Sequence, residues 1–273
     1  MNKYFKIIMC IIAIVLMAVM LIFMRQREHI IQTSSQGGDT NFSGIDNKKI
    51  GWGIKRALEH QQPDVGSENS KILRQYDGLF LGDKDKKNVY LTFDSGYEAG
   101  YTEKILEVLG QNDVKATFFL TEHYINSRED LVKRMIDEGH IIGNHTSKHK
   151  SLPDISEQQI KQEVLSLHTL VYEKFGYEMK YIRPPKGEYS QRSTAITNSL
   201  GYKTVMWSLA YDDWDEKKQG REEYGKEKII ENIHNGAIIL LHGTSKDNSN
   251  ILDYCIKEIK NMGYEFKNLD QFE

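Results

Sequence analysis

The sequence predicts an α/β protein whose main domain is a distorted (β/α) barrel of about seven strands. From residue 88 onward, short apolar runs alternate with longer segments in which apolar residues recur every three or four positions. Strands that alternate with helices imply βαβ units and a mainly parallel sheet. Some runs are apolar throughout, such as AIILL at 237–241, as expected for strands covered on both faces. An open doubly wound sheet is the alternative interpretation of the same rhythm.

The N-terminal segment 1–27 is predicted to be an uncleaved transmembrane anchor. Residues 7–24 are uncharged and about as long as a bilayer is thick, and basic residues flank this run on both sides. A signal peptide would have a shorter apolar core and a cleavage site of small residues, whereas Arg25, Gln26 and Arg27 follow here. The flanking charges nearly balance, so the positive-inside rule leaves the orientation open.

The remaining chain is expected to contain three parts. Residues 28–50 are rich in small polar residues and are predicted to be a solvated linker. Residues 51–86 carry scattered apolar residues and are expected to pack as an extension on the main domain, 87–273. Within that domain, strands are expected at 89–93, 116–120, 141–144, 180–183, 204–207, 237–242 and 264–267, and helices at 102–111, 128–138, 157–175, 191–200, 226–235 and 250–262.

The composition is that of a globular protein and excludes several functional classes. Of 273 residues, 39% are hydrophobic and 27% are charged, and the formal net charge is −3. This near-neutral balance gives no electrostatic support for nucleic acid as the main partner. The sequence has two cysteines, Cys10 and Cys255, and Cys10 lies in the apolar run. A disulfide scaffold and a cysteine-based zinc site are therefore excluded.

Titratable residues recur at the C-terminal ends of the predicted strands. These residues are Asp94, His145, Arg183, Asp212, Asp213 and His242. Enzymes built from β/α units carry their active sites at this edge of the sheet. A single residue of this kind could be a strand cap, but several together predict a catalytic site.

Two histidines four positions apart, His145 and His149, give the sharpest local signal. If the segment turns helically, this spacing places both imidazoles on one face, where two neutral nitrogens can share a divalent ion. Two solvent-exposed loop histidines are the alternative. Oxygen-rich neighbours and the lack of cysteine favour a catalytic ion with open positions over a structural zinc.

Five segments together resemble the ordered motifs of polysaccharide deacetylases with a NodB homology domain. The segments are TFDSG at 92–96, HTSKH at 145–149, RPPKG at 183–187, the stretch 207–214 and LLH at 240–242. The resemblance spans about residues 87–272. Within the family, the serine at 95 and the runs at 143–145, 207–210 and 241–248 are similar to N-acetylmuramic acid deacetylases that form muramic δ-lactam in spore cortex peptidoglycan. The upstream segments 52–53 and 76–83 are similar too.

The resemblance implies a role for each matching residue in amide hydrolysis. His145 and His149 would hold a divalent metal ion, for which Zn²⁺ is expected and Co²⁺, Mn²⁺ or Fe²⁺ would also suit. Asp94 would be the general base, and Arg183 would hold its carboxylate by a forked hydrogen bond. His242 would be the general acid.

The resemblance also implies four supporting residues. Asp213 would keep the general acid protonated and oriented. The backbone N–H of Lys186 would donate to the tetrahedral oxyanion. Leu241 and Trp214 would line a pocket for the acetyl group.

Two positions depart from the usual family pattern, and both departures are shared with the muramic subgroup. The second Asp of the first motif, a metal ligand, is Ser95 here. Water, the Ser95 hydroxyl or Asp94 would then complete the ligand set, and metal affinity should be weaker in the first two cases. The first Asp of the D-x-x-D-W motif aligns with Ala210, which leaves Asp213 as the partner of His242.

The function implied is a membrane-anchored deacetylase of N-acetylmuramic acid in peptidoglycan. It would act on the glycan strand after an amidase has removed the stem peptide, so that the freed amine can close onto the lactyl carboxyl. The catalytic domain would then lie outside the cytoplasmic membrane. Two alternatives are a deacetylase of N-acetylglucosamine in peptidoglycan or chitooligosaccharides, and a non-catalytic glycan-binding module that lost turnover with the second Asp.

Overall fold

The computed structural model describes residues 41–273, together with Phe5, Ile12 and Met17. Apart from these three residues, the predicted anchor and most of the predicted linker therefore fall outside the described residues. Within the described part, no helix has the length and apolar character needed to cross a bilayer. Residues 42–273 form one structural unit, which carries all elements discussed below.

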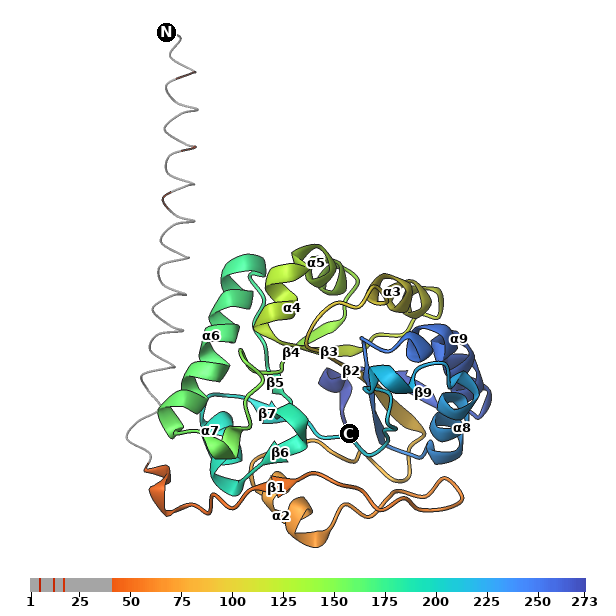
Figure 1. Cartoon of the computed structure of the whole chain (residues 1–273), viewed down its shortest axis with the longest axis horizontal. Coiled ribbons are helices and arrows are strands. Elements are labelled where there is room, and N and C mark those ends of the chain that lie inside the picture. The colour runs from red at the N-terminus through yellow and green to blue at the C-terminus, as the bar shows by residue number, and fades with distance from the viewer. Residues whose placement is uncertain (1–4, 6–11, 13–16, 18–40) are drawn as a thin grey trace. The chain divides into compact units, whose positions relative to one another are not determined.

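A curled sheet of seven parallel strands lies at the centre of this unit (Figure 1). The strand order is β7-β5-β4-β3-β2-β8, and β9 pairs with the first residues of β2. The strands are β2 (Asn88–Ser95), β3 (Thr117–Leu120), β4 (Ile141–Asn144), β5 (Tyr181–Ile182), β7 (Lys203–Thr204), β8 (Ala237–His242) and β9 (Glu265–Lys267). All seven strands predicted from the sequence are present, within a few residues of their expected bounds.

The chain after β7 spans the opening between the two edge strands, β7 and β8. On one side Val205 forms a parallel bridge with Leu79, and on the other Leu209 forms one with Ile239 of β8. The N–H of Leu240 also donates to the carbonyl of Leu209 at 2.9 Å. The sheet is therefore a curled half-barrel with an irregular segment across its gap, and the alternative of an open doubly wound sheet is not adopted.

Buried aromatic and aliphatic side chains on both sides of the sheet hold it to the helices. Seven of the eight residues of β2 are buried, as expected for a strand covered on both faces. Phe93 of β2 stacks on Phe118 of β3 with ring centroids 5.1 Å apart. Burying a side chain of this size contributes about 1.5–3 kcal/mol.

Helices surround the sheet (Figure 1). They are α2 (Ser67–Gln75), α3 (Thr102–Gln111), α4 (Glu122–Ser127), α5 (Glu129–Asp137), α6 (Glu157–Phe175), α7 (Gln191–Ser199), α8 (Glu222–Asn232) and α9 (Lys246–Asn261). The bounds of α6 follow from local chemistry, because Ser156 and Gln159 form a capping box and Gly176 ends the helix at φ 65°. Helices α2 and α4 were not predicted: α4 has only six residues, and the buried residues of α2, Ile72 and Leu73, are adjacent and form no periodic stripe.

The extension 51–86 contacts the loop that follows β5. Strand β1 (Ile50–Gly51) pairs antiparallel with β6 (Glu188–Tyr189). Beside this pair, the N–H of Trp52 donates to the carbonyl of Gly187 at 2.8 Å, and its indole N–H donates to the carbonyl of Trp207 at 2.8 Å. Phe80 lies edge-on to Trp52. The extension thereby packs against the RPPKG segment and stabilises it.

Candidate active site

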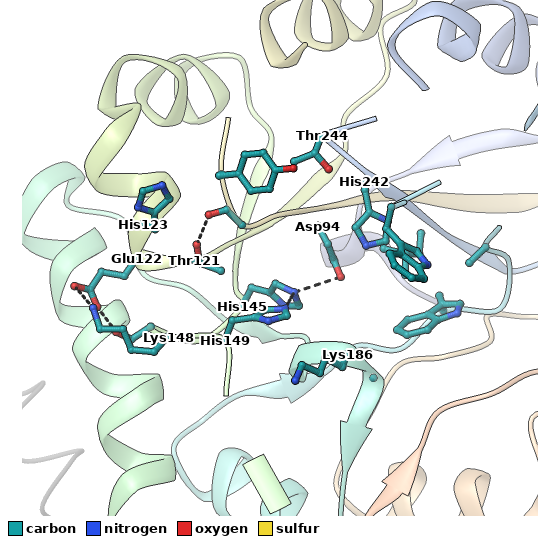
Figure 2. A pocket seen from close by; sticks show the side chains of 18 of the residues that line it. Asp94, Thr121, Glu122, His123, His145, Lys148, His149, Lys186, His242 and Thr244 are labelled. Atoms are coloured by element: carbon teal, nitrogen blue, oxygen red, sulfur yellow. Dashed lines mark hydrogen bonds and ion pairs between the residues drawn. The ribbon is translucent and has the colours of Figure 1, made fainter. Parts of the chain in front are cut away.

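A pocket of about 1140 Å³ opens at the C-terminal ends of the parallel strands. Its lining includes six of the residues predicted from the sequence, namely Asp94, His145, His149, Lys186, Trp214 and His242. Figure 2 shows the carboxylate of Asp94 between His145 on one side and His242 on the other. Asp212 is not part of this group, since it forms ion pairs with Lys218 and Arg221 instead.

Asp94 is held by a fully buried arginine. Nη1 of Arg183 donates to Oδ1 of Asp94 at 2.7 Å, while Nη2 donates to Oγ1 of Thr92 at 2.9 Å and Nε to the carbonyl of Val205 at 3.1 Å. The predicted forked bond to the carboxylate is therefore wrong, because the second arm of the guanidinium goes to Thr92. The guanidinium also lies 4.2 Å from the ring centroid of Phe119, which fixes its plane.

The surroundings of Asp94 keep its carboxyl ionised. Burial alone would raise the pKa of Asp94, but the positive charge of Arg183, followed by His145 and His242, outweighs burial and holds the pKa below its usual range. Because Oδ1 is occupied by Arg183, Oδ2 is the oxygen that faces the histidines, 3.6 Å from Nε2 of His145. A carboxylate with one oxygen anchored and one facing the pocket can accept a proton there.

The two histidines of the HTSKH segment present their Nε2 atoms to each other, 3.2 Å apart. Nδ1 of His145 lies 2.9 Å from the carbonyl of Arg183, which can only accept, so the ring proton is on Nδ1 and the Nε2 lone pair is free. Burial lowers the pKa of His145, and burial with the neighbouring ring lowers that of His149 to about 4. Two neutral nitrogens at this separation suit one divalent ion with bonds of about 2.0–2.1 Å.

The histidines do not meet through a helical turn, as the spacing suggested. Residues 145–149 are not helical, and Thr146 and His149 have φ of 64° and 55°. The side chain of Asn144 accepts from the N–H of Thr146 at 2.9 Å, and the buried carboxylate of Glu163 accepts from the N–H of Lys148 at 2.7 Å. These two side chains, from β4 and α6, hold the loop in the shape that brings the imidazoles together.

A third protein ligand beside the histidines is not evident. Within the described part of the chain, no group of three or more His, Cys, Asp or Glu side chains is arranged to hold a metal ion. Ser95 is 2% exposed and does not line the pocket, and its hydroxyl lies against Gly243, where a Cβ would come within 2.3 Å of Oγ. The Ser95 ligand stays a prediction, and Asp94 is the one of the two residues that borders the pocket.

On the opposite side of the pocket, His242 is held by a buried carboxylate. Oδ1 of Asp213 lies 2.8 Å from Nδ1 of His242, and Oδ2 accepts from the backbone N–H of His242 at 2.7 Å. Burial alone would lower the pKa of His242, but the charge and hydrogen bond of Asp213 outweigh it and raise the pKa above its usual value. The arrangement leaves Nε2 of a protonated imidazole available to donate.

Comparison with known proteins agrees with this geometry. A model of the polysaccharide deacetylase family matches residues 81–205. The chain is 43% identical over 235 residues to the peptidoglycan-N-acetylmuramic acid deacetylase PdaA of Bacillus subtilis (strain 168), and the match covers 86% of this chain and 89% of that protein. The chain belongs to the polysaccharide deacetylase family. As an enzyme of this family it is a carbohydrate deacetylase, and deacetylases of the family are generally metal-dependent.

Two further comparisons extend the match. The solved structure of Bacillus subtilis PdaA, a family 4 carbohydrate esterase, has a TM-score of 0.81 and 43% identity, covering 84% of this chain and 98% of that one. A peptidoglycan-N-acetylglucosamine deacetylase of Bacillus cereus is 32% identical over 201 residues, which is 72% of each protein. The resemblance stated from the five motifs is therefore confirmed.

Of the other three residues predicted to contact the substrate, two line the pocket and one does not. Lys186 lies in the short turn Pro185–Gly187 at φ 60°, and Trp214 is 62% exposed at the pocket. Leu241 is buried in the main core, and its neighbour Leu240 lines the pocket instead. Successive residues of a strand face opposite sides, so a prediction shifted by one position along β8 selects the wrong face.

One residue next to the site to which sequence analysis assigned no role is Asn248, at the start of α9. Its Nδ2 donates to Oδ2 of Asp213 at 2.5 Å and to the carbonyl of His242 at 3.1 Å, while Oδ1 accepts from the hydroxyl of Tyr211 at 2.5 Å. This side chain completes the hydrogen bonding of Asp213 on the side away from the imidazole. Ala210 stands where the usual family motif has Asp, and its methyl side chain cannot form a hydrogen bond to Asp213 or His242.

Proposed function

We propose that this chain is a metal-dependent amide hydrolase that removes the N-acetyl group from N-acetylmuramic acid in peptidoglycan. The observation that carries the proposal is one pocket in which Asp94, a carboxylate with a lowered pKa, lies between a pair of neutral histidines and His242, an imidazole with a raised pKa. Groups with pKa values displaced in opposite directions suit a general base and a general acid. The muramic sugar is favoured because the identity to the N-acetylmuramic acid deacetylase is 43% and that to the N-acetylglucosamine deacetylase is 32%.

Each side chain then has one task in the hydrolysis. Asp94, held by Arg183, accepts a proton from the attacking water through Oδ2. His242 donates a proton to the amide nitrogen, so that acetate and a free amine leave. Asp213 keeps that imidazole protonated and fixes its direction until the C–N bond breaks.

Two further features would stabilise the charge that develops on the amide oxygen. A divalent ion held by His145 and His149, most suitably Zn²⁺, would supply Lewis acidity and a more acidic water. The backbone N–H of Lys186 is fixed in a turn, because Gly187 N–H donates to the carbonyl of Pro184 at 3.1 Å. This N–H would donate to the oxyanion without reorganisation, while Leu240 and Trp214 would border the acetyl methyl.

The wider setting of this proposal rests on the sequence and on the family resemblance. Segment 1–27 would anchor the enzyme in the cytoplasmic membrane with its catalytic domain on the outer side, where the glycan lies. A stem-peptide amidase would act first and leave a free lactyl carboxyl. The amine freed by deacetylation would then condense with that carboxyl, with loss of water, to give the muramic δ-lactam of spore cortex.

Acetate release by the purified chain tests the proposal. Peptidoglycan glycan is supplied with and without amidase removal of the stem peptides, after chelation and with Zn²⁺, Co²⁺, Mn²⁺ or Fe²⁺ added back. Mass spectrometry of the products identifies the sugar that has lost its acetyl group. We expect metal-dependent release confined to peptide-free muramic residues.

Two results would count against the proposal. Free amines on glucosamine residues alone would favour the second candidate, an N-acetylglucosamine deacetylase, which the 32% identical relative supports. A folded protein that releases no acetate from either glycan, with any of the ions, would favour a role in glycan binding without turnover.

A further inference from the structure

The pocket contains a lysine, Lys186, that forms no ion pair with a carboxylate of the described part of the chain. Apart from histidines, its charged lining residues are Asp94, Glu122, Lys148 and Lys186. Asp94 is paired with Arg183, and Oε1 of Glu122 lies 3.1 Å from Nζ of Lys148. Among the residues that the structure describes, Lys186 has no ion-pair partner. Asp154 is affected by the charge of Lys186 but is itself paired with Lys49. The lining of the pocket therefore carries one positive charge that is not in an ion pair.

The backbone holds Lys186 in a fixed place. Its φ of 60° is left-handed, and Gly187, at φ 65°, lies so close to Trp207 that a Cβ there would come within 2.7 Å of the indole. Pro184 and Pro185 restrict the chain on the other side. A non-glycine residue in this conformation costs free energy, and such residues cluster at functional sites.

The ammonium is also close to the reacting centre. Figure 2 shows Lys186 beside the pair His145 and His149. Burial and the neighbouring ring of His145 are the main causes of the low pKa of His149, and the positive charge of Lys186 contributes to it as well. Lys186 and the two histidines line the same pocket, so a group bound at the histidines would lie within electrostatic reach of Lys186.

The muramic sugar itself can supply an anion close to the amide that is hydrolysed. Its lactyl ether is on C3, next to the acetamido group on C2, and the two groups are close enough to close a lactam ring. With the stem peptide attached, the lactyl carboxyl is a neutral amide. Once the peptide is removed it is a carboxylate, a few ångströms from the amide under attack.

We propose that the Lys186 side chain binds the lactyl carboxylate of peptide-free N-acetylmuramic acid and so selects that substrate. The inference rests on the function proposed above and assigns its specificity to one residue. An N-acetylglucosamine residue has a hydroxyl at C3 and makes no use of this charge. A muramic residue with its peptide attached offers a neutral, bulkier group at the same point.

A matched pair of substrates separates this role from a general effect on catalysis. One is peptide-free muramic glycan with a free lactyl carboxyl, and the other is the same glycan with that carboxyl converted to its methylamide. The full chain is compared with Lys186→Met and Lys186→Arg, which keep the backbone N–H. Lys148→Met serves as the control, because that ammonium is already paired with Glu122.

We expect wild type to prefer the free acid and Lys186→Met to lower kcat/KM for that substrate about tenfold, as for a lost hydrogen bond between charged groups. The preference for acid over methylamide should disappear in Lys186→Met, return in Lys186→Arg and persist in Lys148→Met. An equal loss on both substrates in Lys186→Met, or no preference in wild type, would overturn the inference alone. Wild type that releases acetate only from glucosamine residues would instead overturn the proposed function.

Discussion

Two buried carboxylates in this enzyme, Asp94 and Asp213, differ in how many of their oxygens are occupied. Asp94 is bound through Oδ1 by Arg183, and its Oδ2 is turned to the pocket. Asp213 is 2% exposed, with Oδ1 engaged by Nδ1 of His242 and Oδ2 by two N–H donors, one of them from Asn248. The first carboxylate can therefore react, whereas the second can act only through its partner.

The same difference appears in the groups that the two carboxylates serve. The permanent positive charge of Arg183 lowers the pKa of Asp94 against the effect of burial, so Asp94 is a base at neutral pH. The negative charge of Asp213 raises the pKa of His242 against the effect of burial, so His242 is an acid at the same pH. In the first ion pair the carboxylate faces the pocket, and in the second the imidazole does. The two pairs thus place a proton acceptor and a proton donor next to each other.

The largest effect is expected from Asp94→Asn, which removes the reactive oxygen. Deacetylation should fall about a thousandfold, the scale of a lost general base. The buried Arg183 would also lose its counter-charge, which should lower the free energy of unfolding by about 3–5 kcal/mol. Initial rates of acetate release and denaturant unfolding measure the two effects.

Asp212→Asn is the control for that variant, since this neighbouring carboxylate pairs with Lys218 outside the pocket. Its activity should stay near that of wild type. More than a tenth of the activity in folded Asp94→Asn would show that another group accepts the proton.

Asp213→Asn should change the pH profile as well as the rate. Without the negative charge, the raised pKa of His242 falls, so the imidazole loses its proton at lower pH. The alkaline limb of kcat/KM should move down by about one pH unit or more, and the rate at pH 8 should fall about a hundredfold. The acid limb, to which Asp94 and the two metal-holding histidines contribute, should stay in place. A variant whose two limbs both match wild type would remove His242 from the role of general acid.

Local patterns predicted much of this site, whereas the partners of its residues came from distant parts of the chain. The apolar runs predicted the strands, and the strand ends predicted Asp94, Arg183 and His242 at one edge, as the structure has them. The single bond from Arg183 to Asp94 could not be predicted, because the second arm goes to Thr92, two positions back on β2. Only the register of β2 decides that contact.

Asn248 and Leu240 show two different limits of the same kind. Asn248 reaches Asp213 across 35 positions of sequence, and nothing in the local pattern of α9 distinguishes it from a polar residue at the start of a helix. Leu240 and Leu241 are equally apolar and lie in a run that is apolar throughout, so the sequence does not show which of the two faces the pocket. The order of the motifs identified the region of the active site, but the packing of the fold determines which side chain lies in the pocket.

A smaller effect is expected from Asn248→Ala, which leaves Asp213 and its imidazole in place. Oδ2 of Asp213 would lose one donor and the carboxylate could rotate, so activity should fall about tenfold, at the low end for a supporting hydrogen bond. The alkaline limb should shift in the same direction as in Asp213→Asn, but less. Tyr211→Phe removes only the hydroxyl that holds Asn248 and should cost less than Asn248→Ala. A larger loss in Tyr211→Phe would mean that Tyr211 contacts the substrate.

The smallest effect is expected in the extension 51–86 and tests whether that segment influences the Asp94–Arg183 pair without influencing the Asp213–His242 pair. Trp52 contacts the RPPKG segment, which carries Arg183, through Gly187, and its indole N–H donates to the carbonyl of Trp207. Trp52→Phe removes that one hydrogen bond, so the free energy of unfolding should fall by about 1 kcal/mol. Activity should change less than about threefold, with both pH limbs in place, because neither ion pair is touched. A displaced acid limb with an unchanged alkaline limb would show instead that the extension tunes the Asp94 side alone.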